Sequence, residues 1–294
     1  MFAPRTRPGW HRTAPRLRWV AIAALCCAGA SQASPEANTA ALTFGKRTLH
    51  VPPPAGFAAL SASEPSVLLQ AQAYLPQSNR LVEMYQPESG EITDSTGFRT
   101  AYFQVQSLRH MDGVEISTAE FDRLSVETEK ELELAFVKLD ELAETLMSKG
   151  NDSVRSQTGT DPAIALDGTV YLGRDRKEPW GLFFSLRSTL SAGEAGAATS
   201  AKMAMSAALV IIDQQQLMLY AYRRFNGPQD QTWTRDAVSQ WADAVRAANP
   251  DRHVVNTDAR QNGWHWRRTA FMGIAGALIA GLIALVVQLG RRNR

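Results

Sequence analysis

The side chains most suggestive of chemistry are His110 and Asp112, in the stretch RHMDG. A histidine close to a carboxylate is an arrangement that general acid–base catalysis uses. The same stretch also suits a turn, in which Asp112 and Gly113 reverse the chain and His110 packs at the end of a strand. We favour the turn, because a histidine–aspartate pair before a glycine occurs more often as turn chemistry than as a catalytic site.

A second cluster, in the stretch RDRKEPWG, places Arg174, Arg176 and Lys177 beside Trp180. Cationic side chains next to an aromatic ring could bind an anionic ligand. The alternative is an exposed hairpin loop that carries solvated charges, and this is the interpretation that we favour.

The usual sequence signatures of catalysis are absent. The chain contains no Gly-x-Ser-x-Gly elbow, no P-loop, no dinucleotide-binding glycine motif and no calcium-loop spacing. Cys26 and Cys27, its two cysteines, lie in the N-terminal apolar segment, so the mature protein should have no cysteine nucleophile, disulfide or zinc–thiolate site. We therefore expect no catalytic residue, no metal and no cofactor. The alternative is a membrane-tethered, hydrolase-like enzyme whose two carboxylates are far apart in sequence.

The elements that must position any site predict an α+β domain, with helices packed on an antiparallel sheet. Helices are expected at 63–75, 117–150 and 235–249, with Ser63 and Thr234 as N-caps of the first and the last. Strands are expected, from alternation and turn signals, at 41–51 (a hairpin around Gly45 and Lys46), 79–87, 99–110, 164–173 (a hairpin around Asp167 and Gly168) and 179–190. Two long strands at 203–213 and 217–225 are expected to form an antiparallel hairpin.

The long helix expected at 117–150 is the most legible element. Ser117 and Glu120 form a capping box, and apolar residues recur behind them at helical spacing. The pattern allows a break near Val126 and predicts an end at Gly150. The helix holds nine acidic and four basic residues. Such a run is usually a solvated face, and a docking surface for a basic partner is the alternative.

Several stretches carry a resemblance to a known group of proteins. These are LTFGKRTLHVPPPAGF, RLVEMYQP and the ending LMLYAYRRF, which is followed by two tryptophans. They resemble exported, membrane-anchored bacterial proteins and are similar to the PsbP-like α/β sandwich. The resemblance implies a binding or assembly module without catalysis of its own; function inferred from fold alone is an analogy.

The charge of the exported part differs from that of the whole chain. The full sequence has a formal net charge of +2, but residues 34–266 hold 21 basic and 29 acidic residues, a net charge of −8. An acidic domain repels the phosphate backbone, so we expect no nucleic-acid partner.

Residues 1–33 have the features of a signal peptide. The first 18 residues contain five arginines and no acid, and the apolar run WVAIAALCCAGA and the stretch SQAS follow. This pattern predicts export with cleavage after Ala33. Neither Cys26 nor Cys27 has the preceding residues of a lipobox, which indicates ordinary Sec export. The exported α+β domain should span 34–249.

A transmembrane helix is predicted at 269–289. Residues 270–287 contain no charged side chain, and 18 helical residues extend ~27 Å, close to the ~30 Å hydrocarbon core of a bilayer. Trp264 and Trp266, in the tether at 250–268, suit the membrane interface. The alternative, a buried core helix, would normally keep a polar stripe.

Orientation follows from the two ends of the chain. The signal sequence exports the domain, and the helix returns the tail, 290–294, to the cytoplasm. Three tail arginines outnumber Arg267 and Arg268 on the exported side. We expect a single-pass protein of the bacterial inner membrane, with a periplasmic or extracellular domain.

Small residues at four-residue spacing mark one face of this predicted helix. Gly273, Ala277 and Gly281 would let a second helix approach closely. The expected partners are therefore the lipid bilayer and, through this face, a second copy or another membrane helix. The alternative is that the spacing reflects only an alanine- and glycine-rich composition.

Overall fold

In the computed structural model, the described residues are 40–44, 47–90, 92–93, 98–136, 139–159, 163–193 and 199–250. The predicted signal peptide, transmembrane helix and tail, and the tether after Pro250, lie outside these ranges. Among the helices within them, none is long and apolar enough to cross a membrane.

The predicted α+β class is confirmed, because antiparallel sheets carry packed helices. A small sheet consists of β1 (Ala40–Phe44) and β2 (Arg47–Val51). The large sheet has the order β3-β4-β5-β9-β8-β7-β6. Its strands are β3 (Phe57–Ala59), β4 (Asn79–Pro87), β5 (Ala101–Leu108), β6 (Ile164–Glu178), β7 (Gly181–Ala192), β8 (Thr199–Ile212) and β9 (Gln215–Arg224). The helices are α1 (Pro65–Ala73), α2 (Thr118–Phe136), α3 (Leu139–Thr158) and α4 (Pro228–Ala248).

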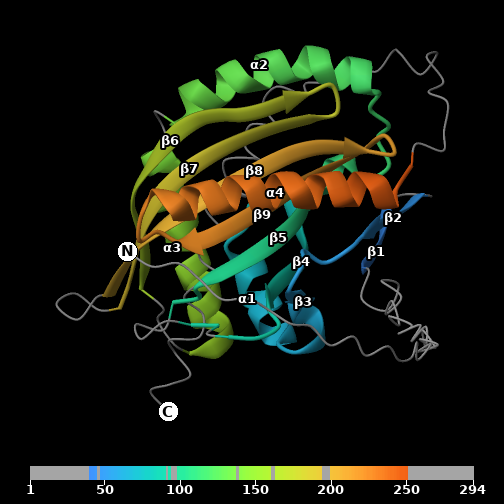
Figure 1. The fold of residues 1–294 in the computed structure, drawn as a ribbon. Helices are drawn as coiled ribbons and strands as arrows, with labels where there is room; N and C mark the ends of the chain where they lie inside the picture. Colours follow the sequence, from blue (N-terminus) through green and yellow to red (C-terminus); the bar gives the residue numbers. More distant parts are fainter. Residues whose placement is uncertain are drawn as a thin grey trace, which may run out of the picture. The chain divides into compact units, whose positions relative to one another are not determined.

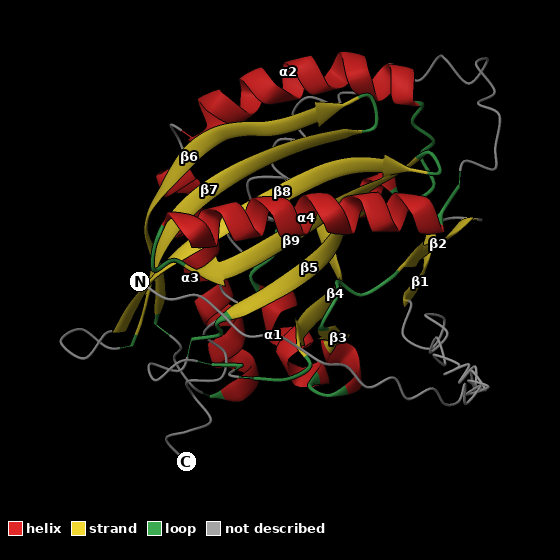
Figure 2. Ribbon diagram, in the orientation of Figure 1, coloured by secondary structure: helices red, strands yellow, loops and turns green. Residues whose placement is uncertain are grey.

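Both faces of the large sheet are covered. Figure 1 shows α4 across one face and α1 and α3 on the other, and Figure 2 shows the sheet between these helices. Successive strand residues point to opposite faces, so β9 sends Leu217 and Leu219 to a core with α4 and the β1–β2 hairpin. Met218 and Tyr220 of the same strand enter a second core with α1 and α3. We call these the α4 face and the α1–α3 face.

The end of α4 is fastened to β2. Asn249 accepts a hydrogen bond from the backbone N–H of His50 at 2.7 Å and donates one to the backbone oxygen of His50 at 2.6 Å. The indole N–H of Trp241 donates to the oxygen of Pro52 at 2.8 Å. The side chain of Asn249 thus bonds both backbone groups of His50, as the backbone of a neighbouring strand would. Residue 250, which follows it, therefore lies beside the β1–β2 hairpin.

The predicted hairpins at 41–51 and 203–225 are confirmed, since β1 pairs with β2 and β8 pairs with β9. The hairpin predicted around Asp167 and Gly168 is wrong. β6 continues through both residues, and its register shifts between Leu166 and Thr169 while β7 runs alongside. Gly168 has φ +112°, so a glycine that suggested a turn instead allows a bulge.

Two predicted helix starts are also wrong. Ser63 does not cap α1, because its hydroxyl donates a hydrogen bond to the backbone oxygen of Leu60 and the N-cap residue is Glu64. Thr234 does not begin α4, which starts at Pro228, two turns earlier. Asp230 accepts bonds from the backbone N–H groups at the start of that helix. The sequence GPQD, with proline in the first turn and an acid behind it, is the better start signal.

The capping box of the acidic helix is confirmed. Ser117 Oγ accepts from the N–H of Glu120 at 3.2 Å, and the Glu120 carboxylate accepts from the N–H of Ser117 at 3.1 Å. α2 runs through Val126 without a break. The single long acidic helix that the sequence predicts corresponds to α2 and α3. Residues 137–138, between the two, lie outside the described ranges.

The predicted end at Gly150 is wrong, because α3 continues through it to Thr158. Gly150 serves packing instead: a Cβ at this position would lie 2.0 Å from Cδ1 of Tyr74. The Tyr74 hydroxyl donates to Asn151 at 3.1 Å, and Asn151 donates to the backbone oxygen of Ile164 at 2.9 Å. These contacts join α1, α3 and the start of β6.

Gly150→Ala should therefore destabilise the domain, although alanine is the better helix former by ~1 kcal/mol. Forcing the Tyr74 ring aside should cost about 1–3 kcal/mol, the usual range for overpacking. Urea unfolding of the two proteins gives the difference. Ser148→Ala, at an exposed position of the same helix, is the control and should be neutral or slightly stabilising. A stabilised Gly150→Ala protein would contradict the packing role.

Candidate functional site: a hydroxyl network beneath α4

The site residues predicted at the ends of the chain lie outside the described residues. They are Ala33, Trp264, Trp266, Gly273, Ala277 and Gly281. Their roles remain predictions from the sequence.

The stretch RHMDG forms a turn. Arg109–Met111 is a short 3-10 helix that contains His110, and Gly113 follows it with φ +80°. The carboxylate of Asp112 pairs with Arg80 of β4 at 3.3 Å. Burial lowers the pKa of His110, and the charge of Asp112 opposes that shift. The arrangement agrees with the favoured turn interpretation.

The basic cluster of β6 is paired with acids of the same chain. Arg174 lies 2.7 Å from Glu129 of α2, and Lys177 lies 3.5 Å from Asp122 of α2. The favoured interpretation, an exposed hairpin loop, is wrong for Arg174, Arg176 and Lys177, which lie within β6. The cluster has its own carboxylates, and part of the acidic face of α2 is occupied by β6. Neither an external anion nor an external basic partner is needed to neutralise these groups.

Arg176 makes contacts with several groups of β6 and α4. Its guanidinium donates to both carboxylate oxygens of Asp243, at 3.0 and 3.1 Å, and to Ser239 of α4 at 2.7 Å. The carboxylate of Glu178 accepts a hydrogen bond from the Nε–H of Arg176 at 3.0 Å. The group also lies 5.5 Å from the ring centroid of Trp180. Arg176 thus joins β6 to α4, and planar two-point bonding makes arginine better suited to this than lysine.

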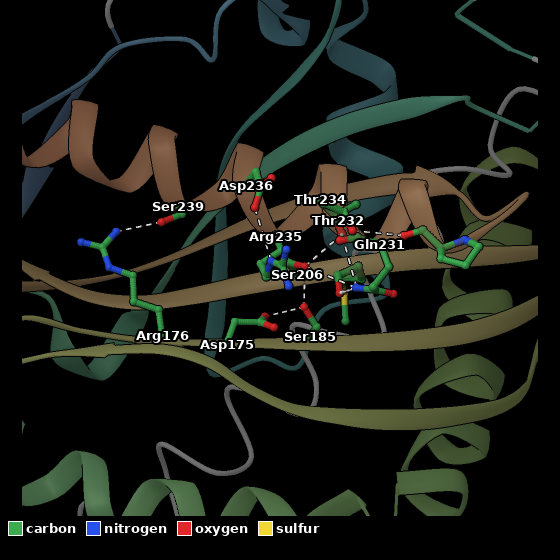
Figure 3. A network of polar contacts seen from close by, with 12 residues as sticks. Asp175, Arg176, Ser185, Ser206, Gln231, Thr232, Thr234, Arg235, Asp236 and Ser239 are labelled. Carbon is green, nitrogen blue, oxygen red and sulfur yellow. Dashed lines mark hydrogen bonds and ion pairs between the residues drawn. The ribbon is translucent and has the colours of Figure 1, made fainter.

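A row of hydroxyl groups lies between β6, β7, β8 and α4 (Figure 3). Ser185 Oγ is 2.5 Å from a carboxylate oxygen of Asp175 and 2.7 Å from Ser206 Oγ. Ser206 Oγ is 2.9 Å from Thr234 Oγ1, which is 3.0 Å from the backbone oxygen of Gln231. The amide of Gln231 donates to the backbone oxygen of Met205 at 3.2 Å.

The sheet register and one bulge build this row. Ser185 and Ser206 are paired residues of β7 and β8, so their side chains share a face. On β6 the register shifts between Arg174 and Arg176, which leaves Asp175 as the bulged residue. A bulge can redirect a side chain, and here the carboxylate faces Ser185.

The network does not resemble a catalytic centre. Ser185 is 2% exposed, and Ser206 and Thr234 are fully buried, so a substrate could not reach these hydroxyls. The two histidines among the described residues, His50 and His110, lie on β2 and in the 3-10 helix, and neither belongs to the network. Its hydrogen bonds can fix the orientation of the three hydroxyl groups and hold α4 on the sheet.

Sequence reasoning missed this network. Thr234 was expected to be a helix cap, and the serines lie in strands predicted from their apolar residues. The available signal is a serine inside an otherwise apolar run, as in FFSL and MSAAL. A buried hydroxyl needs a hydrogen-bond partner, but sequence cannot say which strand supplies it.

A second polar group lies on the α1–α3 face. Tyr102 and Tyr222 stack with ring centroids 4.5 Å apart, and Tyr220 lies 6.1 Å from Tyr222. Burial raises the pKa of all three hydroxyls above the ordinary value. The Tyr222 hydroxyl is buried without a hydrogen-bond partner. An unpaired buried hydroxyl is a cost to stability.

Among the described residues, no cluster of three or more histidine, cysteine, aspartate or glutamate side chains is placed to hold a metal ion.

Comparisons with known proteins give no family assignment. No family model matches the chain, and no curated protein matches it. Similar solved structures include a mutant of the protein Mog1, with 12% identity, a TM-score of 0.25, and coverage of 76% of this chain and 98% of that chain. The Saccharomyces cerevisiae Ran-binding protein Mog1p has 11% identity, a TM-score of 0.23, and coverage of 85% and 94%. At these TM-scores the similarity carries no argument about function.

The buried tyrosines predict a loss of stability at alkaline pH. Their raised folded-state pKa means that their contribution is present below about pH 10, where unfolded tyrosine is neutral, and is lost as the pH rises above it. Tyr222→Phe should reduce that loss and, by removing an unpaired hydroxyl, stabilise the domain by about 1 kcal/mol at neutral pH. Urea midpoints at neutral and alkaline pH measure both effects.

Tyr171→Phe, at a half-buried position, serves as the control and should keep most of the alkaline loss. If Tyr222→Phe loses as much stability at alkaline pH as the wild type does, the buried Tyr222 hydroxyl is not a cause of that loss.

Proposed function

We propose that the chain is a single-pass protein of the bacterial inner membrane, with an exported domain that acts as a non-enzymatic accessory or interaction module. A signal peptide would deliver residues 34–249 across the membrane, and a helix at 269–289 would hold them there. The observation that carries the proposal is the uncharged apolar run at 270–287, followed by a basic tail.

The internal use of polar side chains in the described part supports a module without catalysis. The hydroxyls of Ser185 and Ser206 are buried beneath α4. The carboxylates of Glu178 and Asp243 both pair with the guanidinium of Arg176. A pair of carboxylates engaged in this way does not offer the free acid and base that a hydrolase needs. The resemblance to the PsbP-like group, whose members are mostly accessory proteins, is in keeping with this reading.

The proposed partners are the lipid bilayer and a second membrane helix. Gly273, Ala277 and Gly281 would form the contact surface, because small residues let two helix backbones approach. The acidic exported part argues against nucleic acid as a partner. The exit of residue 250 beside the β1–β2 hairpin would place that hairpin near the start of the tether.

Cysteine labelling tests the topology, since the mature chain should contain no cysteine. In a background with Cys26 and Cys27 replaced by alanine, Leu69→Cys provides an external probe, because Leu69 is 69% exposed. Arg294→Cys probes the tail. A membrane-impermeant maleimide should label the first variant in intact spheroplasts and the second only after lysis. Labelling of Arg294→Cys in intact cells would overturn the proposed orientation.

Purification from gently solubilised membranes tests the partner helix. The wild type should elute with a stoichiometric partner or as an oligomer, and Gly273→Leu/Gly281→Leu should lose that association. Leucine should keep the segment apolar enough for insertion, so the control is equal membrane content of both proteins. A wild type that elutes alone as a monomer would exclude the small-residue face as an interface.

A further inference from the structure

Four contacts between oxygen atoms run from Asp175 to the backbone of α4. They join Asp175 to Ser185, Ser185 to Ser206, Ser206 to Thr234, and Thr234 to the carbonyl oxygen of Gln231. Their lengths are 2.5, 2.7, 2.9 and 3.0 Å in that order. All four lie within the range of O–H···O hydrogen bonds, and each such bond requires one hydrogen.

The three hydroxyl groups supply only three hydrogens. Serine and threonine each carry one O–H donor, a carbonyl carries none, and an ionised carboxylate carries none. When Asp175 is ionised, one of the four contacts must therefore bring two oxygens together without a hydrogen between them. A proton on Asp175 supplies the fourth hydrogen. Asp175 then donates to Ser185, and every later hydroxyl donates to its next neighbour towards α4.

The amide of Gln231 replaces the missing hydrogen poorly. Its Nε2 lies 3.5 Å from Ser206 Oγ and 3.4 Å from Thr234 Oγ1, and its shorter bond, at 3.2 Å, goes to Met205. Since Ser206 and Thr234 are fully buried, water cannot readily satisfy them. An unsatisfied contact in such a place carries the full cost of desolvation.

The charged groups around Asp175 are mixed in sign. From α4, Arg235 and Asp236 face it, and they are paired with each other at 3.3 Å. On β6 it lies between Arg174 and Arg176, which are held by Glu129 and Asp243 respectively. Of the elements around it, β7 contributes the neutral hydroxyl of Ser185. No single opposite charge therefore fixes the carboxylate in its ionised form.

We propose that Asp175, together with the hydroxyls of Ser185, Ser206 and Thr234, forms a proton-binding site that links acidity to the seating of α4 on β7 and β8. Asp175 lies on the exposed edge strand, so its proton exchanges with solvent, while the hydroxyls carry the effect under the helix.

The direction of the pH effect follows from the same geometry. Partial burial raises the pKa of Asp175, while the bond from Ser185 and the charge of Arg235 oppose the rise. A group with a raised folded-state pKa contributes stability below its unfolded pKa, and that contribution is lost as pH rises through the folded value. The seating of α4 should thus be firmest in mild acid and weaken towards neutrality. Because the Asp175 side chain still contacts solvent, screening should keep the effect modest.

Two variants separate the hydroxyl row from simple burial of a carboxyl. Asp175→Asn carries its own N–H donor, so it should lose the wild-type dependence on pH and remain as stable at neutral pH as in acid. Thr234→Val keeps the shape of threonine but removes two contacts and one hydrogen. The two remaining contacts, Asp175 to Ser185 and Ser185 to Ser206, can then both be made with the hydrogens of the two serines. An ionised Asp175 would leave no contact without a hydrogen.

The measurement is the urea midpoint of the full chain in detergent between about pH 4 and 7, where an aspartate of raised pKa titrates. Tryptophan fluorescence reports on α4, which contains Trp233 and Trp241. Asp152→Asn, an exposed acid of α3 outside the row, is the control and should keep the wild-type pH profile. Both Asp175→Asn and Thr234→Val should lose the part of the profile that this control retains.

Each other outcome overturns the proposal. A wild-type pH profile in Asp175→Asn would show that Asp175 binds no proton of consequence. A flat profile in Asp175→Asn with a wild-type profile in Thr234→Val would show burial alone, without the hydroxyl row. If Asp175→Asn does not fold, the carboxyl carbon shift of Asp175 decides: its NMR titration midpoint should be lower in Thr234→Val than in the wild type.

Discussion

The requirement to cover β8 and β9 on both faces governs the rest of the structure. These strands form the middle of the large sheet, and nearly all of their residues are buried. A sheet buried on both sides needs two separate apolar layers. One is supplied by α4 with the β1–β2 hairpin and the other by α1 and α3. The first core therefore joins residues that are far apart in the sequence, such as Phe44 and Val245. The bond between Asn249 and His50 closes the first layer.

Burial on this scale also places polar groups in the interior. Their hydrogen bonding differs between the two faces of the sheet. On the α4 face, Ser185, Ser206 and Thr234 form a connected row that reaches the exposed edge at Asp175. On the α1–α3 face the hydroxyl of Tyr222 lacks a partner. A connected polar row rigidifies a packing arrangement, whereas an isolated group only weakens it. The first face is therefore the one in which a change of protonation can alter how a helix is held.

The edge strand β6 connects the surface charges with this interior. Its basic residues pair with α2 on one side and with α4 on the other. Its bulges interrupt the regular edge, which guards against pairing with another chain. The acidic character that the sequence assigns to one helix is thus partly balanced inside the domain.

The sequence by itself determined the α+β class, the β1–β2 and β8–β9 hairpins, the capping box of α2 and the turn at Asp112, because each depends on neighbours within a few residues. It misplaced the features that depend on distant contacts. Gly168 suggested a turn but sits in a bulge because β7 continues alongside it. Gly150 suggested a helix end but makes room for Tyr74. Thr234 suggested a cap but is buried against Ser206. The hydroxyl row could be seen only in the tertiary structure. It joins side chains of three strands and a helix, and it depends on the bulge at Asp175 and on the packing of Thr234 against Ser206, which are contacts between distant residues.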